Sequence, residues 1–206
     1  MRPFRLAVTC AALFSVTLGA QAANLIQVPV PTSDGGFNVA LVAWNNRSLP
    51  HPAELVWGIS QVRVTGTGSG IIKGSFDYAL NRLGSGQAPS GTFSLYYLSK
   101  RSPTESHTAG AALAVGFLAV MQGHTVRPGI ALTGSIEPDG RIGAVGDFRD
   151  IINTAAREGY TMVLVPSGQL RDPRWYISAR EMTGTVAVQE VGSIDEAYFL
   201  MTGNRL

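Results

Sequence analysis

The residues best suited to chemistry lie where a polar loop runs into a long apolar segment, at Thr108. Ala109 and Gly110 follow this threonine, and the chain then stays largely apolar as far as Val120. A hydroxyl at the N-terminus of a buried helix lies beside free backbone N–H groups and the positive end of the helix dipole. It can cap these groups, or they can stabilise the oxyanion that forms when the hydroxyl attacks a carbonyl. From the residue types alone, an N-cap threonine is the favoured interpretation.

Other kinds of site find little support in the sequence. The glycine-rich stretch at 66–70 has neither the lysine spacing of a P-loop nor a complete GxGxxG motif, so a flexible loop is expected there. The chain contains no HExxH, GxSxG, CxxC or EF-hand pattern. Its three histidines, His51, His107 and His124, are scattered along the chain. We therefore expect neither a metal nor a cofactor.

The composition is that of an ordinary globular chain. Of the 206 residues, 45% are hydrophobic and 15% are charged, which excludes an intrinsically disordered protein. A single cysteine cannot form an intrachain disulfide, so a disulfide-stabilised fold is excluded as well. Sixteen basic residues against fourteen acidic ones give a formal charge of +2, which argues against a nucleic-acid-binding protein. The length suits one domain.

Residues 1–22 have the pattern of a secretory signal peptide. Arg2 and Arg5 begin it, an apolar run follows, and Ala20-Gln21-Ala22 is a small-residue cleavage signal. The apolar run, Leu6–Leu18, is too short to span about 30 Å of hydrocarbon, so no stable membrane anchor is expected after cleavage. We therefore expect a secreted or periplasmic protein, with a single domain over residues 23–206.

Apolar periodicity and turn residues indicate the elements that must position Thr108. Two apolar runs, Leu25–Val30 and Phe37–Val42, flank Asp34-Gly35-Gly36 and predict a hairpin. The segment Thr108–Gln122 is apolar on every side, which predicts a helix buried all round. Further strands are expected over Glu54–Thr65 (with one slip in its alternation), Phe93–Leu98, Gly129–Ile136, Met162–Val165 and Val186–Val191.

Three more helices and one turn complete the expected elements. Helical spacing is found at Ile71–Leu83 and at 147–158, where Gly159 ends the helix, and a capping box at Ser193–Glu196 opens a last helix through Met201. Pro138-Asp139-Gly140 predicts a turn. Strands and helices mix without strict alternation, so the class is α/β or α+β.

The stretch from 99 to 166 resembles the proteolytic domain of Lon proteases. Ser102–Gly110 is similar to the family loop TPKDGPSAG, in which the serine is the nucleophile and Ala-Gly follows it. Leu132–Ile136 then resembles the family strand that ends in Thr-Gly, and Ile142–Arg149 resembles the segment that carries the catalytic lysine. The resemblance covers most of residues 36–203. It implies a single α+β domain of the Lon proteolytic type, with serine-type peptide hydrolysis as the ancestral activity.

The chain departs from the family at both catalytic positions. Thr108 stands at the position of the serine, and Arg149 stands at the position of the lysine. A guanidinium stays protonated up to about pH 12 and offers no lone pair, so it cannot act as the general base. The resemblance therefore implies that catalysis is lost or weak and that the groove is kept for peptide binding. Arg149 can instead hydrogen-bond Thr108 or pair with Glu105 or Asp147 and so hold the old pocket together.

Two alternatives stay open. In the first, the chain is an active peptidase with Thr108 as nucleophile and a relocated base, either Lys100 or His107, with Ser106 a weaker candidate nucleophile. In the second, it is a purely structural oligomer. Thr133 matches a family threonine that orients the catalytic amine, and is here more simply a strand hydroxyl with a hydrogen-bond partner.

The resemblance also implies partners. We expect a peptide or an unfolded protein as ligand and a possible homo-oligomeric ring, and no nucleic acid. No ATP is expected to be used, because the sequence holds no nucleotide-binding motif. Arg171 and Arg174-Trp175-Tyr176 form either an interface patch or a segment that covers the core.

Overall fold

A computed structural model describes residues 24–32, 34–45, 54–59, 62–65, 70–84, 91–98, 107–146, 148–171 and 186–206; for 54–59 and 62–65 it describes the backbone alone. The expected signal peptide, Lys100, Glu105, Ser106 and the segment 174–176 lie outside these residues. No helix in the described part of the chain is long and apolar enough to cross a membrane.

The N-terminal half forms a five-stranded sheet in the order β1-β2-β5-β3-β4. The predicted hairpin is confirmed: β1 (Asn24–Pro31) pairs antiparallel with β2 (Phe37–Asn45). In the turn, the carboxylate of Asp34 accepts bonds from the Thr32 hydroxyl and the Gly36 amide. The strand predicted over Phe93–Leu98 is β5 (Thr92–Tyr97), which pairs antiparallel with β2.

The single strand predicted over Glu54–Thr65 is wrong. The chain forms β3 (Glu54–Ile59), which lies parallel to β5, and then β4 (Val62–Thr65), which pairs antiparallel with β3. Ile59 and Val62 are register partners, so the chain reverses direction between them. The slip in the alternation therefore marks a tight hairpin.

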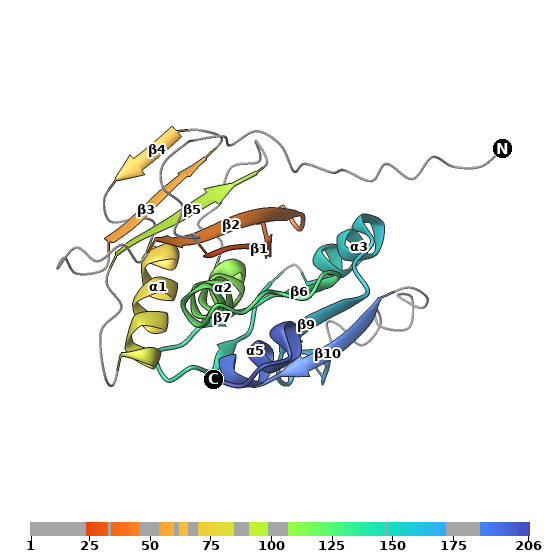
Figure 1. The fold of residues 1–206 in the computed structure, drawn as a ribbon. Helices are drawn as coiled ribbons and strands as arrows, with labels where there is room; N and C mark the ends of the chain where they lie inside the picture. The colour runs from red at the N-terminus through yellow and green to blue at the C-terminus, as the bar shows by residue number, and fades with distance from the viewer. Residues whose placement is uncertain are drawn as a thin grey trace.

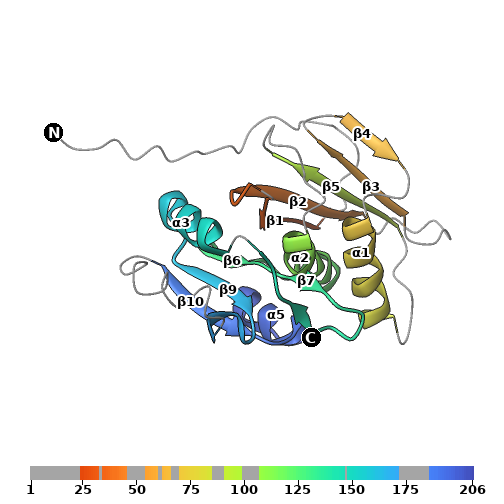
Figure 2. The ribbon, with the colours of Figure 1, turned by 180° about the vertical axis from the view of Figure 1, so that it is seen from behind.

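The apolar helix is the centre of the molecule (Figures 1 and 2). A 3₁₀ turn, η1 (His107–Ala109), leads into α2 (Gly110–Gln122), and every residue of α2 from its start through Val120 is buried, as predicted. The helix lies below β1 and β2 and beside α1 (Gly70–Leu83). Where α2 passes β1, only a glycine fits, because a Cβ on Gly116 would lie 2.7 Å from Val28 Cγ2.

The C-terminal half forms a three-stranded parallel sheet in the order β10-β9-β6 and a separate two-stranded ribbon. Its strands are β6 (Ile130–Leu132), β9 (Met162–Pro166) and β10 (Ala187–Val191), and the ribbon pairs β7 (Ser135–Ile136) with β8 (Ile142–Gly143). Separate mixed and parallel sheets packed with helices make this an α+β domain.

The single strand predicted over Gly129–Ile136 is also wrong, because it breaks at Gly134. This residue has φ +150, a conformation that residues with a side chain rarely adopt, and a Cβ there would collide with Ile142 Cγ2. The break sends β6 into the parallel sheet and β7 into the ribbon over the start of α2.

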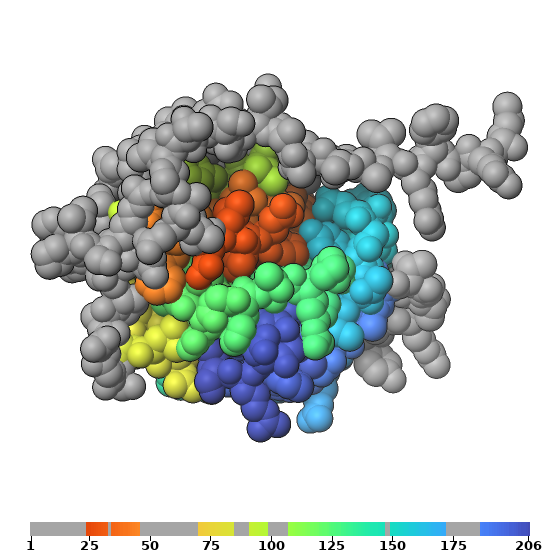
Figure 3. Space-filling view, viewed as in Figure 1, coloured from red at the N-terminus to blue at the C-terminus, as the bar shows by residue number. Residues whose placement is uncertain are grey.

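Two helices complete the C-terminal half. On the face that Figure 3 shows, the red strands, the green middle segment and the blue C-terminal end lie directly against one another. On α3 (Phe148–Glu158), Ile151, Ile152 and Ala155 are buried, and Gly159 at φ +83 ends the helix as predicted. The capping box of α5 (Ile194–Thr202) is confirmed, since Ser193 Oγ accepts from the Glu196 amide at 3.3 Å.

Candidate functional site

Thr108 lies in η1, half-buried, directly before α2. The N-cap position of α2 is occupied by Ala109, whose side chain makes no capping bond. The expected N-cap threonine is therefore wrong, because the helix begins through a 3₁₀ turn that moves the cap one residue along the chain.

The backbone around Thr108 is held by the break between β6 and β7. The Gly134 amide donates to the Thr108 carbonyl at 3.0 Å, and the Ala111 amide donates to the Gly134 carbonyl at 2.9 Å. The Thr133 amide in turn donates to Leu164 of β9 at 3.0 Å. The turn that carries Thr108 is thus tied through two residues to the parallel sheet.

A second tie comes from α1. Ser75 is fully buried, and its hydroxyl lies 2.8 Å from the Ile71 carbonyl and 2.9 Å from the Gly110 carbonyl, so one proton is shared between an intrahelical bond and a bond to α2. Sequence reasoning missed this residue. The signal was present, because Ser75 is a polar residue on the apolar face of a helix, between Ile72 and Phe76.

Thr108 opens onto a cavity of ≈ 550 Å³ that it shares with His107, Ser135–Glu137 and Ala144–Gly146. A neighbouring cavity of ≈ 310 Å³ reaches Gly110 and the first turns of α1. A third, of ≈ 630 Å³, extends along α1 to the turn at 138–140 and the start of α5. Ile136 lines all three, so the cavities adjoin at this residue, and we call them together the Thr108 groove.

The structure brings some of the predicted site residues together. Thr108, Gly110 and the alternative base His107 line the Thr108 groove. Arg149, in contrast, is exposed on the first turn of α3 and is not among the described residues that line the groove. The pairing of Arg149 with Thr108, Glu105 or Asp147 stays a prediction, and Lys100 and Glu105 lie outside the described residues.

Thr133 differs from its expected role. Its side chain is fully buried, and its hydroxyl finds no hydrogen-bond partner among the residues that the structure describes. The prediction of a strand hydroxyl with a partner is therefore wrong: Thr133 lies in the break after β6, where its backbone amide is bonded and its hydroxyl is not bonded to any described residue. A buried hydroxyl without a partner costs about 1–3 kcal/mol, so such groups are rare away from functional sites.

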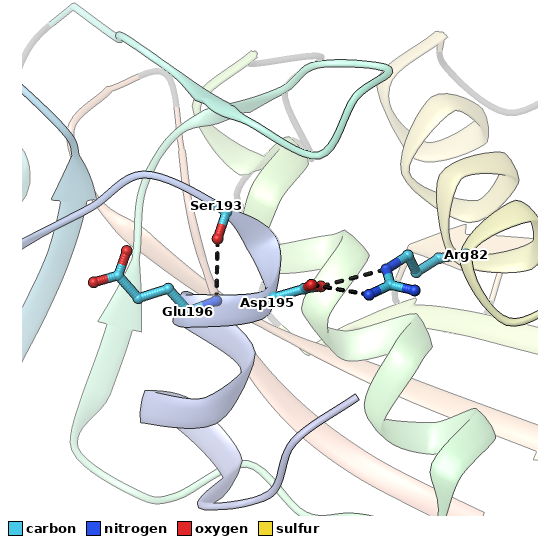
Figure 4. A network of polar contacts seen from close by, with 4 residues as sticks. All are labelled: Arg82, Ser193, Asp195 and Glu196. Atoms are coloured by element: carbon cyan, nitrogen blue, oxygen red, sulfur yellow. Dashed lines mark hydrogen bonds and ion pairs between the residues drawn. The ribbon is translucent and has the colours of Figure 1, made fainter.

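The far end of the groove is polar and built on ion pairs. Arg82 of α1 reaches Asp195 of α5, with 2.9 Å between Nη2 and Oδ2 (Figure 4). This bond raises the pKa of the arginine, and burial raises the pKa of Tyr78 beside it. In the turn at 138–140, the Arg141 guanidinium lies 2.6 Å from Asp139 and lowers the pKa of that carboxyl.

No group of three or more histidine, cysteine, aspartate or glutamate side chains in the described part of the chain could hold a metal ion. The part of the groove at Thr108 is lined by two hydroxyls, one imidazole and one carboxylate: Thr108, Ser135, His107 and Glu137.

Comparison with known proteins agrees with this arrangement. A family model, the Lon protease (S16) C-terminal proteolytic domain, matches residues 49–197. The Lon protease of Endomicrobium trichonymphae is 33% identical over 70 residues, which are 34% of this chain and 9% of that protein. Lon protease 2 of Herpetosiphon aurantiacus is 36% identical over a stretch with the same shares.

A longer match, to the Lon protease of Neorickettsia sennetsu, is 26% identical over 129 residues, or 58% of this chain and 16% of that protein. The chain thus matches only a small part of the length of these relatives. The family model, however, covers well over half of the chain and includes η1, α2, β6–β9 and α3. The chain belongs to the Lon protease proteolytic-domain family.

Proposed function

We propose that this chain is an exported, ATP-independent Lon-like protein that binds flexible peptides in the Thr108 groove and hydrolyses them weakly or not at all. The observation that carries the proposal is the buried hydroxyl of Thr133, which no residue in the described part of the chain satisfies. By the family resemblance this threonine orients the amine of the catalytic lysine, and here an arginine stands at the position of that lysine.

The chemistry of peptide hydrolysis explains why the substitution matters. As the hydroxyl attacks the carbonyl, its proton must pass to a base that is neutral at the working pH. A lysine amine can be made neutral by burial. Arg149 is exposed, and a guanidinium keeps its charge and offers no lone pair. Thr108 therefore lacks the proton acceptor that the family mechanism uses.

Restoring the lysine is the sharpest test. We expect the purified chain to leave unstructured casein intact and the variant Arg149→Lys to gain slow cleavage, measured by release of labelled fragments. The double variant Thr108→Ala, Arg149→Lys is the matched control and should lose that gain. Cleavage by the unaltered chain that is at least as fast as cleavage by Arg149→Lys, and that disappears in Thr108→Ala, would overturn the proposal.

That last outcome would support the active-peptidase alternative, which one observation favours. His107 lines the same cavity as Thr108, and a neutral imidazole carries the ring-nitrogen lone pair that a general base needs. The variant His107→Gln separates the two functions, because it should abolish hydrolysis by an active enzyme and leave peptide binding in place.

Export and assembly belong to the same proposal. Cleavage after Ala22 or Ala23 would be read directly by N-terminal sequencing of protein from the periplasm or the medium. A homo-oligomeric ring is proposed from the family resemblance alone, and light scattering of the purified chain would give its mass.

A further inference from the structure

We propose that Glu137 makes the Thr108 groove select peptides with a basic side chain. The inference rests on the peptide binding proposed above and adds the class of ligand. Glu137 directly follows β7 and lines both the cavity at Thr108 and the large cavity beside α1. A side chain of a peptide lying along the groove must therefore pass close to it.

Hydrogen bonds of both its amide and its carbonyl hold the backbone of Glu137 in place. Its amide donates to the Arg141 carbonyl at 3.0 Å, and its carbonyl accepts from the Gly140 amide at 2.9 Å, which closes the turn after β7. Its carboxylate accepts from the Ser135 hydroxyl at 3.4 Å, two residues earlier on the same face of the ribbon. The carboxylate is therefore oriented before any ligand arrives.

Gly143 makes room for this arrangement. It is the register partner of Ser135, and a Cβ added to it would lie 2.7 Å from Glu137 Oε1 and would also collide with the Ser135 hydroxyl. The hydroxyl and the carboxylate thus occupy the space that a larger residue on β8 would fill.

Of the four carboxylates that line the large cavity, Glu137 is the one without a cationic partner among the described residues. Each of the other three that line the large cavity pairs with a cation of the chain: Asp77 with Lys73, Asp139 with Arg141 and Asp195 with Arg82. Glu137 is half-buried and forms no ion pair with a described residue. Arg141 interacts with it at longer range while its guanidinium is bound to Asp139.

A partly buried carboxylate whose bonded partner is a neutral hydroxyl gains most from an ammonium or guanidinium group. Charge-assisted hydrogen bonds are about twice as strong as neutral ones, and partial burial reduces their screening by salt. The formal charge of the whole chain is +2, so a preference for basic peptides cannot arise from general attraction. It would have to come from this local site.

Three fluorescein-labelled peptides of one unstructured sequence, with a central lysine, glutamine or glutamate, test the inference by fluorescence anisotropy. We expect the lysine peptide to bind the unaltered chain about tenfold more tightly than the glutamine peptide. Glu137→Gln should remove this preference but keep binding of the glutamine peptide, and Glu137→Lys should shift the preference to the glutamate peptide. Glu158→Gln removes an exposed carboxylate from the end of α3 and should change nothing.

The outcomes separate the two proposals. If all three peptides bind the unaltered chain equally, or if Glu137→Gln keeps the preference for lysine, the selection by Glu137 is wrong and the peptide groove stands. If no peptide binds, the proposed function fails and the inference fails with it. Thermal melts of each variant show that loss of preference is not loss of fold.

Discussion

Thr133 combines complete burial with a hydroxyl that no described residue satisfies. The nearby backbone N–H groups already have acceptors. The Thr133 amide donates to the Leu164 carbonyl and the Gly134 amide donates to the Thr108 carbonyl, so neither is available to the Thr133 hydroxyl. A buried hydroxyl without a partner lowers the stability of the fold. Such a group persists only where no selection acts against it or where it has a role in a functional site. At the residue scale, this isolated hydroxyl is what the proposed loss of a lysine from the site would leave behind.

Replacing Thr133 by valine should therefore stabilise the chain. Valine keeps the shape and removes the unsatisfied hydroxyl, so the free energy of unfolding should rise by about 1 kcal/mol in urea titrations. Thr202→Val is the matched control: that hydroxyl is buried and donates to the Tyr198 carbonyl at 2.8 Å, so its loss should lower stability by about 1 kcal/mol. Equal losses in both variants would mean that the Thr133 hydroxyl has a partner.

At the scale of elements, α1 and α2 are joined by one buried side chain. The Ser75 hydroxyl bonds the carbonyl of Gly110, two residues after Thr108, so the orientation of α1 and the start of the functional turn are coupled. Phe76 packs edge-on against Phe117 and Phe93 beside this bond, with ring centroids 5.2 and 5.0 Å apart. The bond therefore lies at the edge of a tightly packed aromatic cluster.

Ser75→Ala should lower the free energy of unfolding by about 1–2 kcal/mol, because the Gly110 carbonyl loses this buried donor. The measurement is again a urea titration, with Ser167→Ala, an exposed position, expected to stay within about 0.5 kcal/mol of the unaltered chain. If Ser75→Ala were as mild as the surface control, the bond would not hold the two helices.

The elements also show what the sequence could and could not predict. Local signals were sufficient for α2, whose apolar residues on every side required burial, and for α5, whose capping box is present. They failed where pairing is decided by distant residues. The slip before Val62 is a hairpin because β3 pairs with β5, and the break at Gly134 depends on contacts with Ile142 and Thr108.

The residues of the candidate site also divide into those that local sequence signals predict and those that depend on long-range contacts. Motif order predicts Thr108 and Arg149 as the dyad positions by resemblance, whereas Ser75, Glu137 and the isolation of Thr133 depend on which surfaces meet in three dimensions. No periodicity places Glu137 over Gly143, because that contact exists only once β7 and β8 have paired.

At the scale of the whole molecule, the stability of the fold depends on three tyrosines whose phenol groups must stay neutral. Burial raises the pKa of Tyr97 on β5, and it raises those of Tyr160, before β9, and Tyr198, on α5, to about 12 in each case. Tyr160 packs on Phe37 of β2, and the Tyr198 hydroxyl lies 2.6 Å from His124 Nδ1. Tyr160 therefore lies at a contact between the N-terminal and C-terminal halves, and Tyr198 lies at a contact between α5 and the residues that follow α2.

This distribution predicts cooperative alkaline unfolding. A phenol whose pKa is raised by folding stabilises the protein fully below the unfolded pKa, about 10, and the contribution is lost as pH rises through the folded pKa. Stability should thus be level up to about pH 10 and fall steeply towards pH 12, with tyrosinate absorbance rising together with loss of the circular dichroism signal. Tyr97→Phe removes one buried phenol and should make the fall less steep. If the full tyrosinate signal of all six tyrosines formed well before the circular dichroism changed, these three rings would be open to solvent in the folded chain.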